Sequence, residues 1–266
     1  NMTNLLCALM ISVATAQGEN LQILDHASTP NRMMTLYLNN LANVALDKRD
    51  EDRDALRTSE EITASGVELR RFFLDELGPF PEKNDLNARV VDKQERDGYR
   101  FEKVIFESRP GMFVTGVLFL PLCDAPYPGV LVPCGHSATG KLNEVYQRAC
   151  ISLAQNGIAA FIYDPIGQGE RYQLLDENDK PRFGATIEHM IVGVGCIPLG
   201  MNTASYRIWD GIRALDYLTS RPEIDPKRIG CTGNSGGGTM TSYLMALDDR
   251  IACAAPGCYL TSFRRL

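Results

Sequence analysis

The sequence of 266 residues predicts an α/β fold, with a doubly wound, mostly parallel sheet and a helical extension at its N-terminal side. From residue 98 onward, a hairpin pattern is followed by short apolar runs that alternate with amphipathic stretches. Such alternation is typical of parallel strands joined by helices that cover both faces of a sheet. A glycine-rich turn at 233–238, between an apolar run and a helical pattern, supports the same fold class.

Residues 1–17 are predicted to be a signal peptide, because an apolar run ends in the small-x-small pattern Ala14-Thr15-Ala16. We therefore expect an exported protein, located in the periplasm or outside the cell. A short buried or amphipathic helix is the alternative, because no Lys or Arg precedes the apolar run.

Residues 18–97 are predicted to form an N-terminal helical extension. Apolar residues recur at helical spacing between 33 and 46, and the charged run 47–57 is expected to be a solvated helix face. The sequence Gly78-Pro79-Phe80-Pro81 ends the helical pattern.

The catalytic core is predicted to span residues 98–266. The expected strands are 99–108, 112–120, 129–133, 158–163, 228–232 and 251–255, and the expected helices are 144–155, 205–218 and a helix after 235. Residues 172–204 show no regular pattern and are predicted to be an irregular insertion that can form a lid. Sites in such sheets lie at the carboxyl ends of strands, where His136, Asp164 and Ser235 follow their strands.

Composition excludes several classes of partner. The formal net charge of −6 argues against nucleic acid or an anionic membrane surface, and no apolar run is long enough to span a membrane. The eight cysteines contain no C-x-x-C pair, so we expect neither a metal nor another cofactor, and most of them are expected to be buried. The sequence predicts neither a disulfide pairing nor an oligomeric state.

The pentapeptide Gly233-Asn234-Ser235-Gly236-Gly237 fits the pattern G-x-S-x-G, in which a serine sits on a sharp turn between a strand and a helix. Small residues two before and two after the serine let the strand and the helix pass closely. Ser235 is therefore the candidate nucleophile, and the backbone N–H of Gly236 is a candidate oxyanion donor. A glycine-rich turn without chemistry is the structural alternative.

Residues 135–142 come within one position of a phosphate-binding loop, G-x-x-x-x-G-K-[ST]. The pattern fails at Leu142, where a hydroxyl is needed to hold Mg²⁺. Nucleotide hydrolysis also leaves Ser235 unexplained, and it is the weaker hypothesis.

Four segments together resemble the α/β-hydrolase fold: 131–136, 163–171, 224–230 and 233–237. They are most similar to its acetyl xylan esterase and dienelactone-hydrolase-like branches, which also contain relatives of prolyl oligopeptidases. The resemblance covers residues 98–266. It implies a serine esterase that forms an acyl-enzyme, with acetylated carbohydrate as the favoured substrate class.

The resemblance implies that Ser235 is the nucleophile and that Gly236 and His136 supply the backbone N–H groups of an oxyanion hole, with Ser137 as the second choice. In this fold the acid and the histidine follow the nucleophile along the chain. Residues 236–266 hold no histidine, so we expect the sequence to be C-terminally incomplete. Asp248 does follow Ser235, but it is expected to mark a helix end.

Two alternatives to an esterase remain open. Without its base the chain can serve as a catalytically incomplete scaffold or binding module, and a serine peptidase of the prolyl-oligopeptidase type is the enzymatic alternative. His136 or His189 is the base if the chain as given is active. Asp164 and Arg171 are expected to fix the conformation of their loop.

Overall fold

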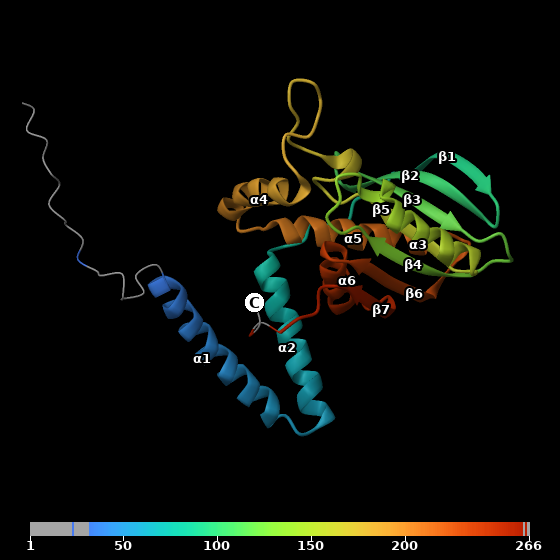
Figure 1. Ribbon diagram of the computed structural model, residues 1–266. Coiled ribbons are helices and arrows are strands. Elements are labelled where there is room, and N and C mark those ends of the chain that lie inside the picture. The colour runs from blue at the N-terminus through green and yellow to red at the C-terminus, as the bar shows by residue number, and fades with distance from the viewer. Residues whose placement is uncertain (1–22, 24–31, 263, 265–266) are drawn as a thin grey trace, which may run out of the picture. The chain divides into compact units, whose positions relative to one another are not determined.

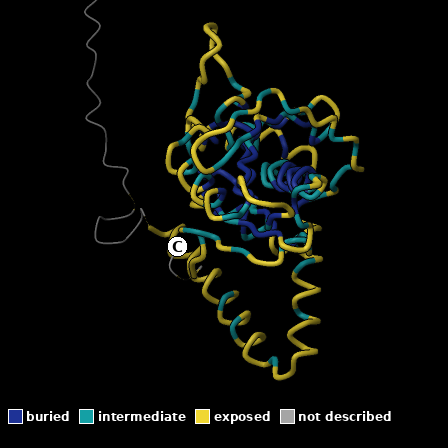
Figure 2. The backbone as a smooth tube through the Cα atoms, turned by 90° about the vertical axis from the view of Figure 1, so that its right-hand side faces the viewer, coloured by how far each residue is buried: buried dark blue, intermediate teal, exposed yellow. Residues whose placement is uncertain are grey.

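The computed structural model describes residues 23, 32–262 and 264, and the chain divides into two compact units, 1–57 and 58–266. The first unit contains helix α1 (Met33–Ala55), which has no buried residue (Figure 2). Its charged run is mostly exposed, as expected of a solvated helix face. The predicted signal peptide at 1–17 lies outside the described residues, and so does Cys7.

The second unit is built on a seven-stranded sheet with the order β1-β2-β3-β5-β4-β6-β7 (Figure 1). The strands are β1 (Arg89–Arg96), β2 (Tyr99–Arg109), β3 (Met112–Leu120), β4 (Tyr127–Pro133), β5 (Ala159–Tyr163), β6 (Ile224–Asn234) and β7 (Ile251–Gly257). Strands β5, β4, β6 and β7 pair in parallel, whereas β1, β2, β3 and β5 pair antiparallel in that order. Strand β2 therefore has the same direction as β4–β7, and the sheet is mostly parallel, as predicted.

Five helices accompany the sheet: α2 (Ser59–Leu77), α3 (Glu144–Gln155), α4 (Ala185–Cys196), α5 (Thr203–Ser220) and α6 (Gly236–Leu247). Three short 3-10 turns lie at η2 (Gly140–Leu142), η3 (Gly169–Arg171) and η4 (Ile197–Leu199). The segment 172–204 is therefore not wholly irregular, because α4 occupies its centre. Nearly uniform apolar residues and two glycines, Gly193 and Gly195, hide the helical period of α4 in the sequence.

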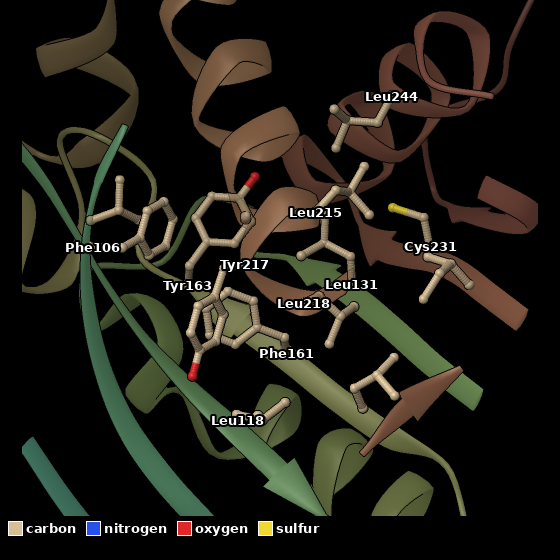
Figure 3. Packing of buried hydrophobic residues seen from close by; sticks show 14 of the residues in the cluster. Phe106, Leu118, Leu131, Phe161, Tyr163, Leu215, Tyr217, Leu218, Cys231 and Leu244 are labelled. Atoms are coloured by element: carbon tan, nitrogen blue, oxygen red, sulfur yellow. The ribbon is translucent and has the colours of Figure 1, made fainter. Parts of the chain in front are cut away.

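Helices cover both faces of the sheet, as the alternation of strands and helices predicts. Cys150 and Ala154 of α3 pack on one face against Val132 and Ile162. Helices α5 and α6 pack on the other face, where most of the large buried side chains gather (Figure 3). There the ring of Tyr217 stacks on Phe106 at 6.1 Å and contacts Phe161 at 4.9 Å between centroids. Tyr217 is thus a core residue, as expected.

Helix α2 belongs to the second unit. A capping box starts it, because the Thr58 side chain accepts from the Glu61 N–H while the Glu61 carboxylate accepts from the Thr58 N–H. At its other end Leu77 is buried in the core. Phe73 meets Tyr243 of α6 edge to face at 4.9 Å, so α2 packs on the side of the sheet that α5 and α6 cover.

Strand β1 is a strand that the sequence analysis did not predict, and it lies within the range expected to be a helical extension. Charged and polar residues dominate it, and its side chains alternate between exposed and half-buried. It pairs only with β2, at the edge of the sheet. An edge strand with one partly covered face has too few apolar positions for a clear period-two signal.

Four of the described cysteines, at positions 134, 150, 196 and 231, are buried, and three, at 123, 253 and 258, are exposed. All seven are free thiols. None of the helices in the described part of the chain is long and apolar enough to cross a membrane. Within residues 32–262, the structure also holds no group of three or more His, Cys, Asp or Glu side chains arranged to bind a metal ion.

Two helical glycines allow a matched test of core packing. A Cβ at Gly211 in α5 would lie 2.7 Å from Leu244 Cδ1 and 3.1 Å from the Tyr163 hydroxyl, whereas a Cβ at Gly66 in α2 would meet nothing within 4 Å. We expect Gly211→Ala to lower the free energy of unfolding by about 1–3 kcal/mol, because it overpacks a filled core. Gly66→Ala should raise it by up to about 1 kcal/mol through helix propensity. Urea unfolding of both variants checks this, and equal signs for the two would contradict it.

Candidate active site

Ser235 is an exposed residue on a sharp turn between β6 and α6. Its backbone adopts φ 55° and ψ −121°, a conformation that is strained for a residue with a side chain. The turn is held by its neighbours, because the Ser235 N–H donates to Gly257 O at 2.9 Å and the Thr239 N–H donates to Ser235 O at 2.9 Å. The bend expected from G-x-S-x-G is therefore present, and it exposes a serine at the carboxyl end of a strand.

The glycines around Ser235 have no room for a side chain. A Cβ at Gly233 would lie 2.6 Å from both Gly237 O and Pro133 O, and a Cβ at Gly237 would lie 2.2 Å from Pro133 O. Real Cβ atoms essentially never approach a backbone oxygen this closely, so only glycine fits either position. The close passage of β6, α6 and the end of β4 explains the spacing of the motif.

Gly236 and His136 come together beside Ser235. Gly236 is the first residue of α6, so its N–H has no partner within the helix. The His136 N–H makes no hydrogen bond to any described residue. A Cβ built on Gly236 would lie 3.6 Å from the His136 backbone nitrogen and 3.0 Å from its ring atom Nδ1. Two unpaired backbone donors next to an exposed serine can bind a developing negative charge.

The His136 ring is held by a second histidine from helix α4. His189 Nε2 lies 2.7 Å from Ile166 O, and His189 Nδ1 lies 3.2 Å from His136 Nε2. A carbonyl only accepts, so His189 carries its proton on Nε2 and accepts at Nδ1 when neutral. His136 then donates from Nε2, and its Nδ1 is the unprotonated nitrogen on the side of Gly236.

Both histidines are kept neutral near pH 7. Burial lowers the pKa of His189 to about 4, and the positive charge of Arg207 adds to this effect. Burial and the same arginine also lower the pKa of His136. In the described part of the chain, neither histidine hydrogen-bonds to the Ser235 hydroxyl, so neither one is placed as its base.

Tyr146 of α3 connects the His136 loop to the serine turn, a role that no sequence pattern indicated. Its hydroxyl accepts from the Gly135 N–H at 2.7 Å and donates to Asn234 O at 3.4 Å. Gly135 itself has no space for a side chain, because a Cβ there would lie 2.3 Å from Asn234 O. The residue pattern of α3 is that of an ordinary amphipathic helix, which hides a single tyrosine with a specific contact.

Asp164, at the end of β5, organises the two loops beside the site. Its fully buried carboxylate accepts from the Lys141 ammonium at 2.6 Å, from the Lys141 N–H at 2.7 Å and from the Glu170 N–H at 3.0 Å. Gly140 and Gly169 pack directly against it, since a Cβ on either would lie within 2.5 Å of a carboxylate oxygen. This contact set is that of a residue fixing loop geometry.

The same contacts explain why residues 135–142 resemble a phosphate-binding loop without binding phosphate in the same way. The Lys141 ammonium is buried and pairs with Asp164 and Glu170. It therefore points into the protein, toward carboxylates, and is not presented to a phosphate. The bond to Lys141 also lowers the pKa of Glu170 against the opposing effect of burial.

Arg171 and Gln168 complete the loop after β5. The Arg171 guanidinium is buried and donates to Asp210 Oδ2 at 2.7 Å and to Asp164 O at 3.0 Å. The Gln168 amide donates to Gly135 O at 2.8 Å and to Ser137 O at 3.0 Å. This loop thus supports the loop that carries His136, in line with the role expected for Asp164 and Arg171.

Asp248 does not take part in this site. It caps the end of α6 and binds Arg250, and a helix of 12 residues places it about 18 Å from Ser235. The arginine helps to lower the pKa of Asp248 although burial acts in the opposite direction. Its contacts are those of a helix terminus, as expected.

A serine on a strand–turn–helix elbow, at the carboxyl edge of a sheet with this strand order, defines an α/β hydrolase. Residues 72–266 match the family model described as acetyl xylan esterase (AXE1). The chain belongs to this acetyl xylan esterase family.

The chain is also similar in sequence and structure to known hydrolases and esterases. A protein of Bacillus subtilis (strain 168), "Putative hydrolase YtaP", is 27% identical over 208 residues, which cover 72% of this chain and 64% of that protein. The structure of Methylesterase BT1017 matches with a TM-score of 0.64 and 26% identity, over 78% of this chain and 44% of the other. Acetyl xylan esterase from Paenibacillus sp. R4 shares the fold, with a TM-score of 0.53 and 24% identity over 76% and 60% of the chains. The chain thus spans less than two thirds of the length of these proteins.

Asp164 provides a test of the loop network. We expect Asp164→Asn to lower the free energy of unfolding by about 3 kcal/mol, because it leaves the buried Lys141 ammonium without its main counter-charge. Asp225→Asn is the control, since the pair of Asp225 with Arg228 is half-exposed and its loss should destabilise the protein much less. Urea unfolding of both variants measures the difference, and equal losses would contradict the buried network.

The histidine pair predicts a pH dependence of stability. The pKa of His189 is about 4 in the folded protein, below its ordinary value of 6.5. Between these values the unfolded chain binds a proton that the folded protein does not, so stability falls as the pH falls from 6.5 to 4. His189→Gln should remove this part of the slope, on the order of 1 kcal/mol after allowance for partial exposure. Urea unfolding from pH 7 to 4 checks this. A difference in the free energy of unfolding between variant and wild type that stays constant with pH would contradict it.

Proposed function

We propose that this protein is a serine carboxylic-ester hydrolase that acts through an acyl-enzyme on Ser235. One observation carries the proposal: an exposed serine in a strained turn adjoins two unpaired backbone N–H groups, those of Gly236 and His136. Acyl transfer needs a nucleophile with backbone donors close to it, and these neighbours of Ser235 support that reading. Membership of the acetyl xylan esterase family supports it.

In this mechanism the Ser235 hydroxyl attacks the ester carbonyl as its proton passes to a base. The carbonyl oxygen gains negative charge, which the N–H groups of Gly236 and His136 stabilise together with the N-terminal end of α6. Collapse of the intermediate expels the alcohol and leaves an acyl-serine. Water then attacks the acyl group, and the carboxylate is released.

None of the described side chains hydrogen-bonds to the Ser235 hydroxyl in this structure, so none of them is in place as its base. The geometry of His136 makes it the alternative base within the described residues, since its Nδ1 is unprotonated and lies on the side of Gly236. A chain without a base would be a weak catalyst and could act only as a scaffold or binding module.

The substrate class follows from the family. We propose an acetylated carbohydrate ester, in keeping with the acetyl xylan esterase family and with the esterases among the structural relatives. We also propose that 172–204 is a lid, because its helix α4 places His189 against His136 at the site. Export through residues 1–17 stays a prediction.

Ser235→Ala should abolish the burst of alcohol released from an aryl acetate. The remaining rate should be no more than about 10³–10⁴-fold above that of water, which an oxyanion hole and binding alone provide. Stopped-flow absorbance measures the burst, and covalent labelling by a fluorophosphonate reports the nucleophile directly.

Ser152→Ala is the matched control, because Ser152 is an exposed residue of α3. It should keep both the burst and the labelling. The experiment is run on the 266-residue chain and on the full gene product. Absence of labelling in both would refute the esterase proposal, and labelling with rapid turnover in the 266-residue chain would make His136 or His189 the base.

A further inference from the structure

The Tyr146 hydroxyl lies between the two segments that carry the candidate nucleophile and the candidate oxyanion donors. It accepts from the Gly135 N–H at 2.7 Å and donates to Asn234 O at 3.4 Å. These two residues directly precede His136 and Ser235, respectively. One hydroxyl group thus bonds to the backbone immediately before each residue that the proposed chemistry uses.

Strand pairing alone does not hold these two segments together. The last register pair between β4 and β6 joins Leu131 with Cys231, and both Gly135 and Asn234 lie beyond it. Within residues 32–262, Tyr146 is the only side chain that hydrogen-bonds both to segment 132–137 and to segment 232–236. Its hydroxyl therefore continues the connection between the two strands where their pairing has ended.

A tyrosine hydroxyl suits this position because it donates and accepts at the same time. The Gly135 N–H needs an acceptor, and Asn234 O needs a donor. Burial raises the pKa of Tyr146, so the phenol keeps the proton that it donates. The groups are packed closely, since a Cβ on Gly135 would lie 2.5 Å from the Tyr146 oxygen. The hydroxyl thus sets the spacing between the two segments.

Tyr146 is itself held in place by the start of α3. The Asn143 side chain caps this helix by accepting from the Val145 N–H at 3.0 Å, and its amide donates to Ser137 Oγ at 3.2 Å. The Tyr146 ring packs against the core cluster that α3 shares with the sheet. The hydroxyl is therefore presented by a fixed element, as precise positioning requires.

The peptide group between Asn234 and Ser235 is held at both ends. Its carbonyl accepts from Tyr146, and its N–H donates to Gly257 O at 2.9 Å. This peptide leads into the strained backbone of Ser235, which persists only when the surrounding structure supports it. Loss of the Tyr146 hydroxyl would remove the support at one of the two ends.

We propose that Tyr146 is a positioning residue for acyl transfer, whose hydroxyl fixes the distance between the His136 N–H and the serine turn. It acts through the backbone of Gly135 and Asn234. An oxyanion hole works because its donors are already in place, so a small displacement slows the chemical step more than it weakens substrate binding. This inference rests on the proposed esterase function and assigns a further residue to it.

Tyr146→Phe tests the inference because it removes only the hydroxyl. We expect kcat for an aryl acetate to fall about tenfold or more while KM stays within about twofold of wild type. The rate of labelling by a fluorophosphonate should fall in proportion, since the tetrahedral phosphorus adduct places an oxygen in the same hole. Both rates are measured on the full gene product.

Tyr127→Phe is the matched control. Tyr127 is a buried tyrosine at the opposite end of β4, and its hydroxyl donates to Cys123 O at 2.7 Å. Each variant loses a hydroxyl that bonds to the backbone, so both should lower the midpoint of urea unfolding to a similar extent. Tyr127→Phe should nevertheless keep the kcat, KM and labelling rate of wild type. The comparison separates lost position from lost stability.

Three results would overturn the inference. They are an unchanged kcat and labelling rate in Tyr146→Phe, an equal kinetic loss in both variants, or a rise in KM alone, which would show that the hydroxyl binds substrate directly. Labelling of the wild type is scored separately. A labelled wild type with an equally reactive Tyr146→Phe rejects the positioning role and leaves the esterase standing. An unlabelled wild type rejects the esterase, and the inference with it.

Discussion

The candidate site depends on one steric constraint, the contact between the end of β4 and the start of α6. Pro133 O approaches Gly237 so closely that only a hydrogen fits between them. This contact brings the loop after β4, with His136, beside the turn that carries Ser235. A side chain at Gly237 would separate the two unpaired N–H groups as well as the helix and the strand. The strain at Ser235 is sustained because tightly packed backbone surrounds it.

A second interaction, the buried carboxylate of Asp164, holds the loops on the other side of the site. Burial of an ion pair contributes little net stability, because desolvation offsets most of the attraction. The pair with Lys141 instead fixes the positions of two loops. Lys141 from the loop after β4 and Glu170 from the loop after β5 both donate hydrogen bonds to the Asp164 carboxylate. The glycines that face Asp164 are required by this closure. One of them, Gly140, is also the second glycine of the spacing that imitates a phosphate-binding loop.

Local patterns predicted much of the fold and the serine turn, because periodicity and glycine spacing are properties of neighbouring residues. Contacts between distant residues escaped prediction. Nothing in the sequence near Lys141 reveals that Asp164 neutralises it, and Tyr146 resembles any other tyrosine of an amphipathic helix. Strand β1 was missed because it has too few apolar positions to show the alternation of a strand. Helix α4 was missed because it has so many apolar positions that the helical period is hidden.

The electrostatics of the site follow from this packing. Arg207 and burial act in the same direction on His136 and His189, so the histidines lose their protons while the arginine retains its charge. A neutral His189 can accept from His136, which fixes the ring beside Gly236. The two backbone donors favour negative charge on the oxygen of the reacting carbonyl. A site organised in this way suits reactions that develop and release anions, as ester hydrolysis does.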